Sequence, residues 1–243
     1  MSFESMEILD LTLPSPEENL ACDEALLDAC EEGLAPEVLR FWTPAQHFVV
    51  LGYSNTLSSE VRLDICRAEK IPVLRRVSGG GAVLQGPGVL NYSLVLRADR
   101  ARLRTIPAAN RSVLERHRKC VAPLLPGPVA FQGDTDLTLS GRKFSGNAQR
   151  RRRDFLLFHG TFLLSLDFSL LEKILPMPGK QPAYRRNRPH REFLANLALP
   201  PGQIKQALAD AWSAREPFPD PPLARIRDLV RSRYADRQWT EKL

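Results

Sequence analysis

Three consecutive glycines stand just after an arginine pair, in the run Arg75-Arg76-Val77-Ser78-Gly79-Gly80-Gly81-Ala82-Val83. Glycine lets the main chain approach a ligand closely, and successive N–H groups in such a turn form a nest for an anion. The arginines add permanent positive charge, and a guanidinium matches the geometry of a carboxylate or a phosphate. The run predicts a site for a phosphate or an acyl phosphate. A tight hairpin beside an exposed arginine pair would have the same sequence pattern, so this alternative stays open.

Two acids, a glycine turn and a lysine follow one another between residues 133 and 149. Carboxylates hold Mg²⁺ beside nucleotide oxygens in many proteins, so Asp134 or Asp136 is a candidate ligand. Lys143 lies between Gly141 and Gly146, where its ammonium would point at a phosphate or a carbonyl oxygen. An ordinary β-hairpin that carries a solvated lysine would give the same pattern.

A histidine and a glycine, His159-Gly160, lead into the apolar stretch Thr161 to Leu164. Such a step can place an imidazole and a backbone N–H at the mouth of a pocket. A lone histidine that only covers the end of a strand is the competing interpretation.

Composition indicates a water-soluble protein, with 43% hydrophobic and 26% charged residues among 243. No apolar run approaches the roughly 20 residues that span a bilayer, and the first residues do not resemble a signal peptide. We therefore expect no membrane association and a cytoplasmic location. Four widely spaced cysteines form no metal or disulfide pattern, and we expect them to be buried apolar residues: Cys22, Cys30, Cys66 and Cys120.

The formal net charge of +6 favours an acidic partner. The charge gathers in two arginine clusters, at residues 149–153 and 184–191. Neither has the aromatic interleaving on a sheet that is typical of nucleic-acid binding, so no nucleic-acid partner is expected. Solvated loops, or surfaces that steer an acidic protein, are the two remaining interpretations.

The elements that must position these residues alternate between strands and helices. A capping box at Ser15 and Glu18, with Pro16 between them, predicts a helix that ends near Gly33. This mixture favours an α+β (mixed α/β) fold in one domain over residues 1–243. We expect strands at 6–13, 37–42, 47–51 (paired with 37–42), 73–74, 89–96, 129–131, 137–139 and 162–166, helices at 58–70, 108–124, 203–214 and 223–234, and a loop at 176–189.

The order of these blocks resembles that of the lipoate–protein ligase family, from about Leu20 to Leu197. The resemblance rests on Phe41-Trp42, Gly52, the run from Arg75 to Val83, Asn91, Gly141-Arg142-Lys143-x-Ser145-Gly146-x-Ala148 and His159-Gly160-Thr161-x-Leu163-Leu164, with Arg188 and Asn196-Leu197 as a weaker block. It implies a mixed sheet flanked by helices, the fold that this family shares with biotin–protein ligases.

The resemblance also implies a reaction. The family's ligases use ATP and Mg²⁺ to convert lipoate to lipoyl-AMP, and then pass the acyl group to a lysine of a lipoyl carrier domain. By motif match Lys143 is the catalytic residue, Asp134 lies near the nucleotide or its Mg²⁺, and Phe144, Phe162 and Val83 bound the tunnel for the acyl tail. The other residues expected to bind are Arg75, Arg76, Ser78, Gly79, Gly80, Gly81, Ala82, Val83, Asn91, Ser145, Gly146, His159 and Gly160.

Two departures from the family pattern leave alternatives open. No C-terminal accessory domain follows, so the chain either depends on a separate accessory subunit or performs only the transfer step. Octanoyltransferase relatives use a cysteine thioester and no ATP, and one branch carries that cysteine in the loop that corresponds to 175–184, where this chain has none. The ATP route is therefore preferred over octanoyl transfer, and a biotin-type or non-catalytic relative ranks lower.

Overall fold

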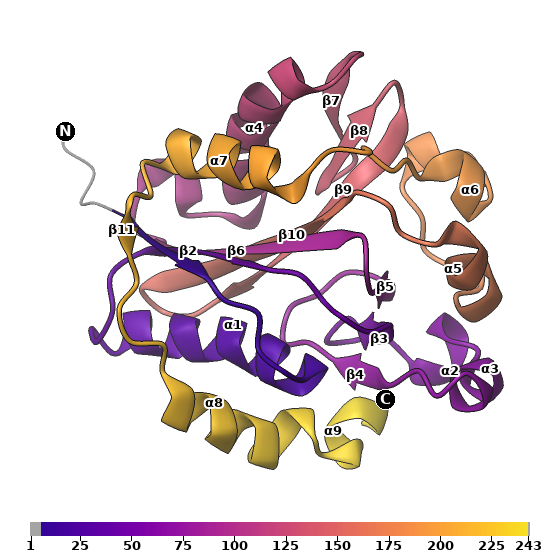
Figure 1. Ribbon diagram of the computed structural model, residues 1–243, viewed down its shortest axis with the longest axis horizontal. Coiled ribbons are helices and arrows are strands. Elements are labelled where there is room, and N and C mark those ends of the chain that lie inside the picture. The colour runs from indigo at the N-terminus through magenta and orange to yellow at the C-terminus, as the bar shows by residue number, and fades with distance from the viewer. Residues whose placement is uncertain (1–5, 243) are drawn as a thin grey trace.

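A mixed eight-stranded β-sheet and a smaller three-stranded sheet form the centre of the molecule, which the computed structural model describes over residues 6–242. The larger sheet has the order β11-β1-β2-β6-β10-β9-β8-β7 and the smaller one the order β4-β3-β5 (Figure 1). The larger sheet comprises β1 (Glu7–Asp10), β2 (Val38–Trp42), β6 (Val89–Arg97), β7 (Val129–Gln132), β8 (Asp136–Leu139), β9 (Arg142–Arg151), β10 (Phe155–Leu163) and β11 (Glu216–Pro217). The smaller sheet comprises β3 (Phe48–Leu51), β4 (Val73–Arg75) and β5 (Val83–Gln85).

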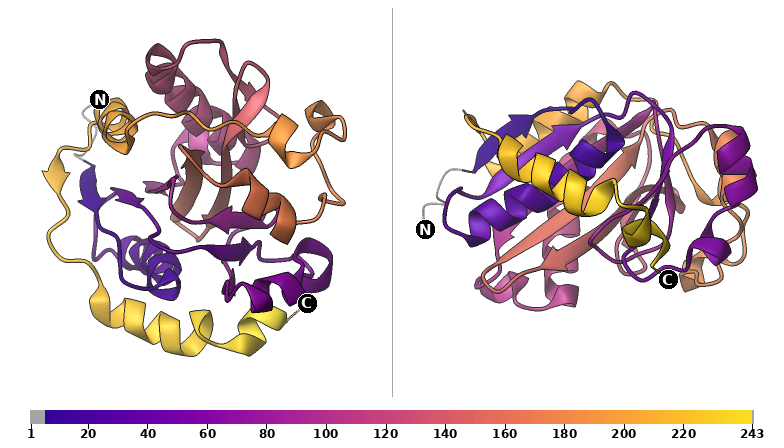
Figure 2. Two further views of the ribbon diagram at one scale, coloured as in Figure 1. Left: turned by 45° about the vertical axis from the view of Figure 1, so that its right-hand side comes forward. Right: turned by 90° about the horizontal axis from the view of Figure 1, so that it is seen from below.

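Helices cover both faces of the larger sheet, as Figures 1 and 2 show. α1 (Pro16–Glu31) and α8 (Leu223–Leu229) lie on one face, and α4 (Ile106–Val121) and α7 (Pro201–Trp212) lie on the other. Successive side chains of a strand point to opposite faces. On β10, Phe158 accordingly packs in the core beneath α4 and α7, and Leu157 packs in the core beside α1. This architecture confirms the predicted mixed sheet flanked by helices.

The smaller sheet packs against a set of short helices. These are α2 (Leu57–Glu60), α3 (Leu63–Ala68), α5 (Phe168–Ile174) and α6 (His190–Phe193). A third apolar core forms there around residues such as Val49, Leu51 and Ile174. α9 (Arg237–Glu241) lies against β4 and brings the end of the described chain to this sheet. The glycine-rich run connects β4 with β5, so it belongs to the smaller sheet.

Several predicted elements differ from the structure. The expected pair of strands at 37–42 and 47–51 is wrong, because β2 joins the larger sheet and β3 the smaller one. Both strands are buried along their whole length, so neither shows an exposed side from which its partner could be inferred. The expected helix at 58–70 is interrupted by extended backbone at Val61 and becomes α2 and α3.

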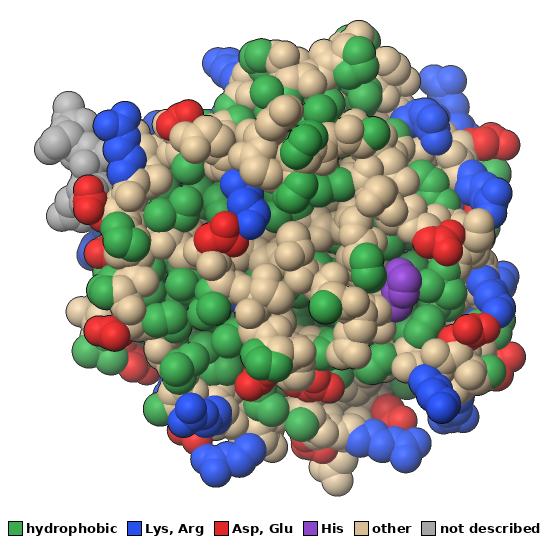
Figure 3. Space-filling model, viewed as in Figure 1, with side chains coloured by type: hydrophobic (Ala, Val, Ile, Leu, Met, Phe, Trp, Pro, Cys, Tyr) green, Lys and Arg blue, Asp and Glu red, His purple; other side chains and the backbone are tan. Residues whose placement is uncertain are grey.

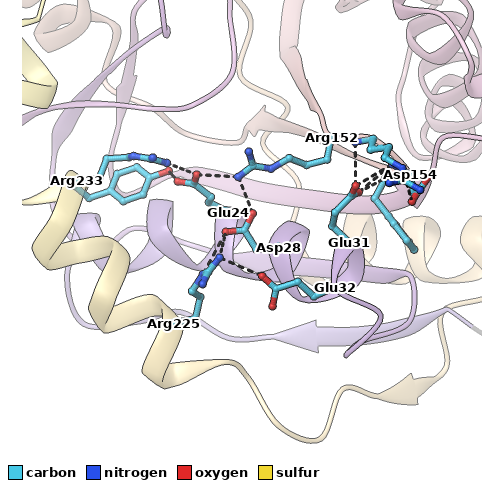
Figure 4. Close-up of polar contacts among 11 residues, drawn as sticks. Glu24, Asp28, Glu31, Glu32, Arg152, Asp154, Arg225 and Arg233 are labelled. Atoms are coloured by element: carbon cyan, nitrogen blue, oxygen red, sulfur yellow. Dashed lines mark hydrogen bonds and ion pairs between the residues drawn. The ribbon is translucent and has the colours of Figure 1, made fainter.

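An ion-pair network fastens the C-terminal helices to α1 (Figure 4). Arg225, from α8, reaches Asp28 on α1 at 2.9 Å, and Arg152 reaches the same carboxylate at 2.7 Å. Arg233 pairs with the buried Glu24, which also accepts a hydrogen bond of 2.9 Å from Tyr234. Removing one partner would leave a buried charge uncompensated, which typically costs about 3–5 kcal/mol. These acids of α1 therefore hold the C-terminal segment in place.

The two arginine clusters serve mainly internal contacts. Arg151 donates to the carbonyls of Leu103 and Arg104, and Arg185 is buried and donates to Arg188 O. On the face seen in Figure 3, basic and acidic side chains alternate around the edge and do not gather into one patch. No helix within residues 6–242 is long and apolar enough to cross a membrane.

Candidate functional site

A cavity of about 180 Å³ lies where the smaller sheet meets β6, β9 and β10 of the larger one. It brings together many of the residues predicted to bind, namely Arg76, Gly80, Gly81, Ala82, Val83, Asn91, Lys143, Gly146, His159 and Gly160. Ten further residues complete its lining: Leu20, Asp23, Trp42, Val50, Gln85, Tyr92, Thr135, Asn147, Ala148 and Thr161.

The glycine-rich run is folded around the guanidinium of Arg76. Arg76 Nη2 donates to the carbonyls of Gly79 and Gly81 at 2.6 and 3.0 Å, and Nη1 donates to Val50 O at 3.2 Å. Gly80 has φ +92°, a conformation that favours glycine. Burial lowers the pKa of Arg76 to about 10, against an opposing effect of Glu60. Arg76 thus stays protonated near neutral pH and holds the run in one shape.

The neighbouring Arg75 points the other way. Its side chain is fully buried and donates to carbonyls of Gly52, Tyr53 and Asn55 on one side and to Thr240 of α9 on the other. Trp239 Nε1 donates back to Arg75 O at 2.9 Å. Arg75 therefore does not line the cavity, and it joins α9 to the strand that leads into the glycine-rich run.

Lys143 lies on the opposite wall, at the start of β9. Its Nζ is 2.7 Å from Asp136 Oδ1, and the side chain is 26% exposed. Asp136 is buried and its other oxygen accepts a hydrogen bond of 2.7 Å from Tyr184. Asp134 is exposed in the turn between β7 and β8, outside the lining of the cavity. Of the two acids considered for Mg²⁺, Asp136 is the one beside the lysine.

Two glycines of the predicted motifs leave room for cavity residues, Gly146 for the flexible end of Lys143 and Gly160 for Asn147 and the backbone of Gly146. A Cβ on Gly146 would lie 2.7 Å from Lys143 Nζ, and a Cβ on Gly160 would lie 1.8 Å from Asn147 Oδ1. Asn147 is itself anchored, because it donates to Thr135 O at 2.7 Å and accepts from Tyr92 at 2.5 Å. Ser145 is buried in β9 beside Asn147 and does not line the cavity. The glycines let Lys143 and Asn147 approach the cavity from the same sheet.

A chain of hydrogen bonds connects α1 with the glycine-rich run through His159. His159 Nδ1 is 3.1 Å from Asp23 Oδ2, and Nε2 is 2.6 Å from the hydroxyl of the buried Ser78. Arg40 donates to Asp23 at 2.6 Å, and Arg76 Nε donates to Ser78 Oγ at 3.1 Å. A carboxylate at Nδ1 favours the tautomer in which Nε2 accepts the serine proton. Ser78 does not line the cavity itself, but it connects two residues that do, His159 and Arg76.

Burial alone would raise the pKa of Asp23, but the charge of Arg40 and the hydrogen bond from His159 hold it below its usual value. Asp23 was missed from the sequence because nothing marks it among the acids of α1. The capping box at Ser15 and Glu18 does form, and it predicts where that helix begins.

Apolar side chains enclose one part of the cavity. Leu20 of α1, Trp42 of β2 and Val50 of β3 line it together with the predicted Val83. Phe144 and Phe162, which were expected to bound an acyl tunnel, instead pack in the core under α4 and α7. Strand alternation explains this outcome, because both side chains point to the face of the sheet opposite the cavity. Asn91 also lines the cavity, in a reciprocal amide pair with Gln85 at 2.8 and 3.0 Å.

All four cysteines lie within the described residues, and none lines the cavity. Burial raises the pKa of Cys22 and Cys120 to about 11 and that of Cys30 to about 12, and it also raises the pKa of Cys66. A thiol needs a lowered pKa to act as a nucleophile near neutral pH. The expected burial is therefore confirmed for Cys22, Cys30 and Cys66, whereas Cys120 is only partly buried.

Comparison with known proteins identifies the family. Residues 15–210 match the model of the lipoyl protein ligase A/B catalytic domain. The octanoyltransferase LipM of Symbiobacterium thermophilum is 33% identical over 71% of this chain and 69% of the relative. The LipM of Lysinibacillus sphaericus is 28% identical over 94% of this chain and 95% of the relative.

A probable lipoate-protein ligase A of Mycoplasma pneumoniae is 31% identical over 80% of this chain, which spans only 59% of that relative's length. A crystal structure of lipoate-protein ligase A bound with ATP superposes with a TM-score of 0.82 at 25% identity, over 98% of both chains. A bipartite lipoate protein ligase of Thermoplasma acidophilum, described with its E2 lipoyl domain, gives 0.84 at 25% identity, over 98% of this chain and 97% of that one. The chain belongs to the lipoyl protein ligase A/B catalytic domain family, whose members here are lipoate-protein ligases and octanoyltransferases.

Proposed function

We propose that this protein activates lipoate with ATP and transfers the lipoyl group to a lysine of a carrier domain. One arrangement carries the proposal: Lys143 faces the preorganised glycine-rich run across a cavity whose apolar part is formed by Leu20, Trp42 and Val50. The apolar part suits a dithiolane tail, and the opposed cationic and N–H groups suit a carboxylate joined to a phosphate. The relative bound with ATP supports the choice of nucleotide.

In the first step a carboxylate oxygen of lipoate attacks the α-phosphorus of ATP, and the bond to pyrophosphate breaks. Negative charge builds on the oxygens between the two reactants, and the ammonium of Lys143 stabilises it there. Lys143 would leave Asp136 to do so. ATP arrives with Mg²⁺, which commonly needs only one or two protein carboxylates, and Asp134 and Asp136 are the candidates.

In the second step the neutral amine of the carrier lysine attacks the acyl carbonyl, AMP leaves with the electron pair of the broken bond, and the nitrogen of the new amide releases its extra proton to solvent. The reacting atoms need proximity more than strong base catalysis, because AMP is a good leaving group. The glycine-rich run and Lys143 hold the acyl-adenylate from opposite sides during this attack. His159, positioned by Asp23, presents its imidazole to the same cavity.

Octanoyl transfer without ATP is the second candidate, and the nearly full-length similarity to LipM supports it. That reaction in relatives proceeds through a cysteine thioester. The absence of any cysteine from the lining, with all four thiols raised in pKa, favours the ATP route for this chain.

The test offers two complete reactions to the purified protein. One contains ATP, Mg²⁺, lipoate and a lipoyl domain, and the other contains octanoyl-carrier protein and a lipoyl domain without ATP. Mass spectrometry of the lipoyl domain reports the product. We expect a lipoyl adduct only in the first reaction, and an octanoyl adduct only in the second would replace the proposal with the transferase.

A further inference from the structure

Two cations converge on an exposed tyrosine beside the glycine-rich run. The guanidinium of Arg150 lies 5.7 Å from the ring centroid of Tyr53, and Lys242 Nζ lies 3.5 Å from the same centroid. Tyr53 is 41% exposed, although its backbone N–H donates to Ser78 O at 2.8 Å. These three residues come from β9, from the turn after β3 and from the segment after α9, and we call them the Tyr53 rim.

Within residues 6–242, no acidic side chain pairs with the two cations of this rim. Arg150 and Lys242 make no ion pair with an acid in the part of the chain that the structure describes, whereas the nearby Arg233 pairs with Glu24. Burial and the positive charges of Arg75, Arg233 and Arg150 lower the pKa of Lys242. Like charges held together cost free energy in the isolated chain, and an acidic partner would relieve that cost.

The rim lies beside residues that line the cavity, although none of its own three residues belongs to the lining. Ala148, two residues before Arg150 on β9, lines the cavity, and so does Gly80. Gly52, next to Tyr53, approaches Gly80 so closely that a Cβ there would lie 1.9 Å from Gly80 O. A protein that covers the rim would therefore lie next to Gly80 and Ala148, which line the cavity.

We propose that the Tyr53 rim docks an acidic protein face that carries the acceptor lysine, so that this lysine enters the cavity beside the glycine-rich run. The inference rests on the proposed function and adds the docking surface to it. It also sharpens the role of the first arginine cluster, because Arg151 and Arg152 make internal contacts while Arg150 turns to the rim.

The experiment compares the rim variant Arg150→Glu with Arg153→Glu, so that both variants change the net charge by the same amount. Arg153 is a matched control, since it lies next to the same strand, is 88% exposed in its side chain and pairs only with Asp154 at 3.6 Å among the residues described. Two acceptors are offered in separate reactions: a lipoyl domain, and hydroxylamine, which needs no docking surface. Binding of a fluorescent lipoyl domain is measured in parallel by anisotropy.

We expect the rim variant to raise the KM and Kd for the lipoyl domain roughly tenfold at low salt and to flatten their salt dependence. Hydroxamate formation should stay unchanged in the rim variant. The variant Arg150→Lys, which keeps the positive charge, should keep most of the affinity for the lipoyl domain. Equal Kd values for the rim variant and Arg153→Glu would overturn the docking surface. Loss of hydroxamate formation in the rim variant alone would overturn it too, and would assign the rim to the nucleotide. A wild-type protein that binds the domain but never forms hydroxamate would contradict the proposed function and not the rim.

Discussion

The two walls of the cavity are built in different ways. On the glycine-rich wall, Arg76 is only 8% exposed. Its guanidinium donates hydrogen bonds to four oxygen atoms, three within the run and one at Val50. On the other wall Lys143 is about a quarter exposed and has one acidic partner, Asp136. A preorganised wall needs no rearrangement when charge develops, whereas a lysine with a single partner can exchange that partner for a ligand. The glycine-rich wall therefore provides a fixed shape, whereas the other wall provides a lysine that can exchange its ion-pair partner.

Removing the adjustable charge should have the largest effect on activity. We expect Lys143→Ala to lower kcat for lipoyl-AMP formation by about 10²–10³-fold, the usual loss when one group that stabilises a developing charge is deleted. The free energy of unfolding should also fall, because the buried Asp136 loses the cation that faces it. Pyrophosphate release measures the reaction, and Lys173→Ala, an exposed lysine on α5, is the control. Activity within threefold of wild type would reject Lys143 as the catalytic residue.

Disturbing the rigid wall should act mainly on stability. Arg76→Lys removes donors to Gly79, Gly81 and Ser78 that one ammonium cannot replace together. We expect a loss of about 1–3 kcal/mol in the free energy of unfolding, since the buried hydroxyl of Ser78 and the partly buried contacts to Gly79 and Gly81 lose their donor. KM for lipoate should rise because the run is no longer held. An unfolding curve that coincides with wild type would show that the run keeps its shape without Arg76.

Changing the partner of the lysine tests whether that wall is adjustable. Asp136→Asn keeps an acceptor for Tyr184 and removes the negative charge that faces Lys143. We expect roughly a tenfold lower kcat, about 1.4 kcal/mol, because the ammonium loses the group that positions it. Tyr184→Phe should change kcat by less, since it leaves the ion pair intact. A tenfold loss in Tyr184→Phe with no loss in Asp136→Asn would show that the loop contact, and not the charge, matters.

A buried histidine behind the cavity gives the smallest effect. His117 packs edge-on against Tyr92 at 4.8 Å and accepts a hydrogen bond from Trp212 at 2.8 Å. Burial lowers its pKa to about 3, so the folded protein keeps it neutral while the unfolded chain takes up a proton below about pH 6.5. Stability should fall by about 1 kcal/mol between pH 6.5 and 5.5 from this group. In His117→Gln that part of the pH dependence should disappear, and an unchanged slope in urea titrations would contradict it.

Local motifs predicted much of the lining of the cavity, and long-range contacts account for the rest of it. Lys143, Gly146 and His159 each sit in a contiguous pattern, and all three line the cavity. Asp23 lies 136 residues from His159 in sequence, so only the packing of α1 on β10 brings them together. Arg75 and Arg76 could not be assigned separately, although neighbouring residues of a strand point to opposite sides and only one could face the cavity.

The strand β9 was not predicted from the sequence, for a related reason. β9 contains Lys143 and several arginines, and its middle residues are only partly buried, so it lacks the alternation of an ordinary strand. It is recognised only when β8 and β10 pair with it on both sides. A strand that carries polar site residues lacks the alternation of apolar and polar residues by which strands are predicted.

The clamp formed by Arg75 has a consequence for the order of folding. Its guanidinium joins the strand before the glycine-rich run to Thr240, which lies 165 residues later in the chain. During synthesis those carbonyls leave the ribosome long after β3 and β4 can pair, and contacts of such separation form slowly. The pairing of β3 with β4 can thus form early, whereas the contact of Arg75 with Thr240 forms only after α9 has been synthesised. Proteolysis of stalled nascent chains should find the run protected only once residue 240 has emerged.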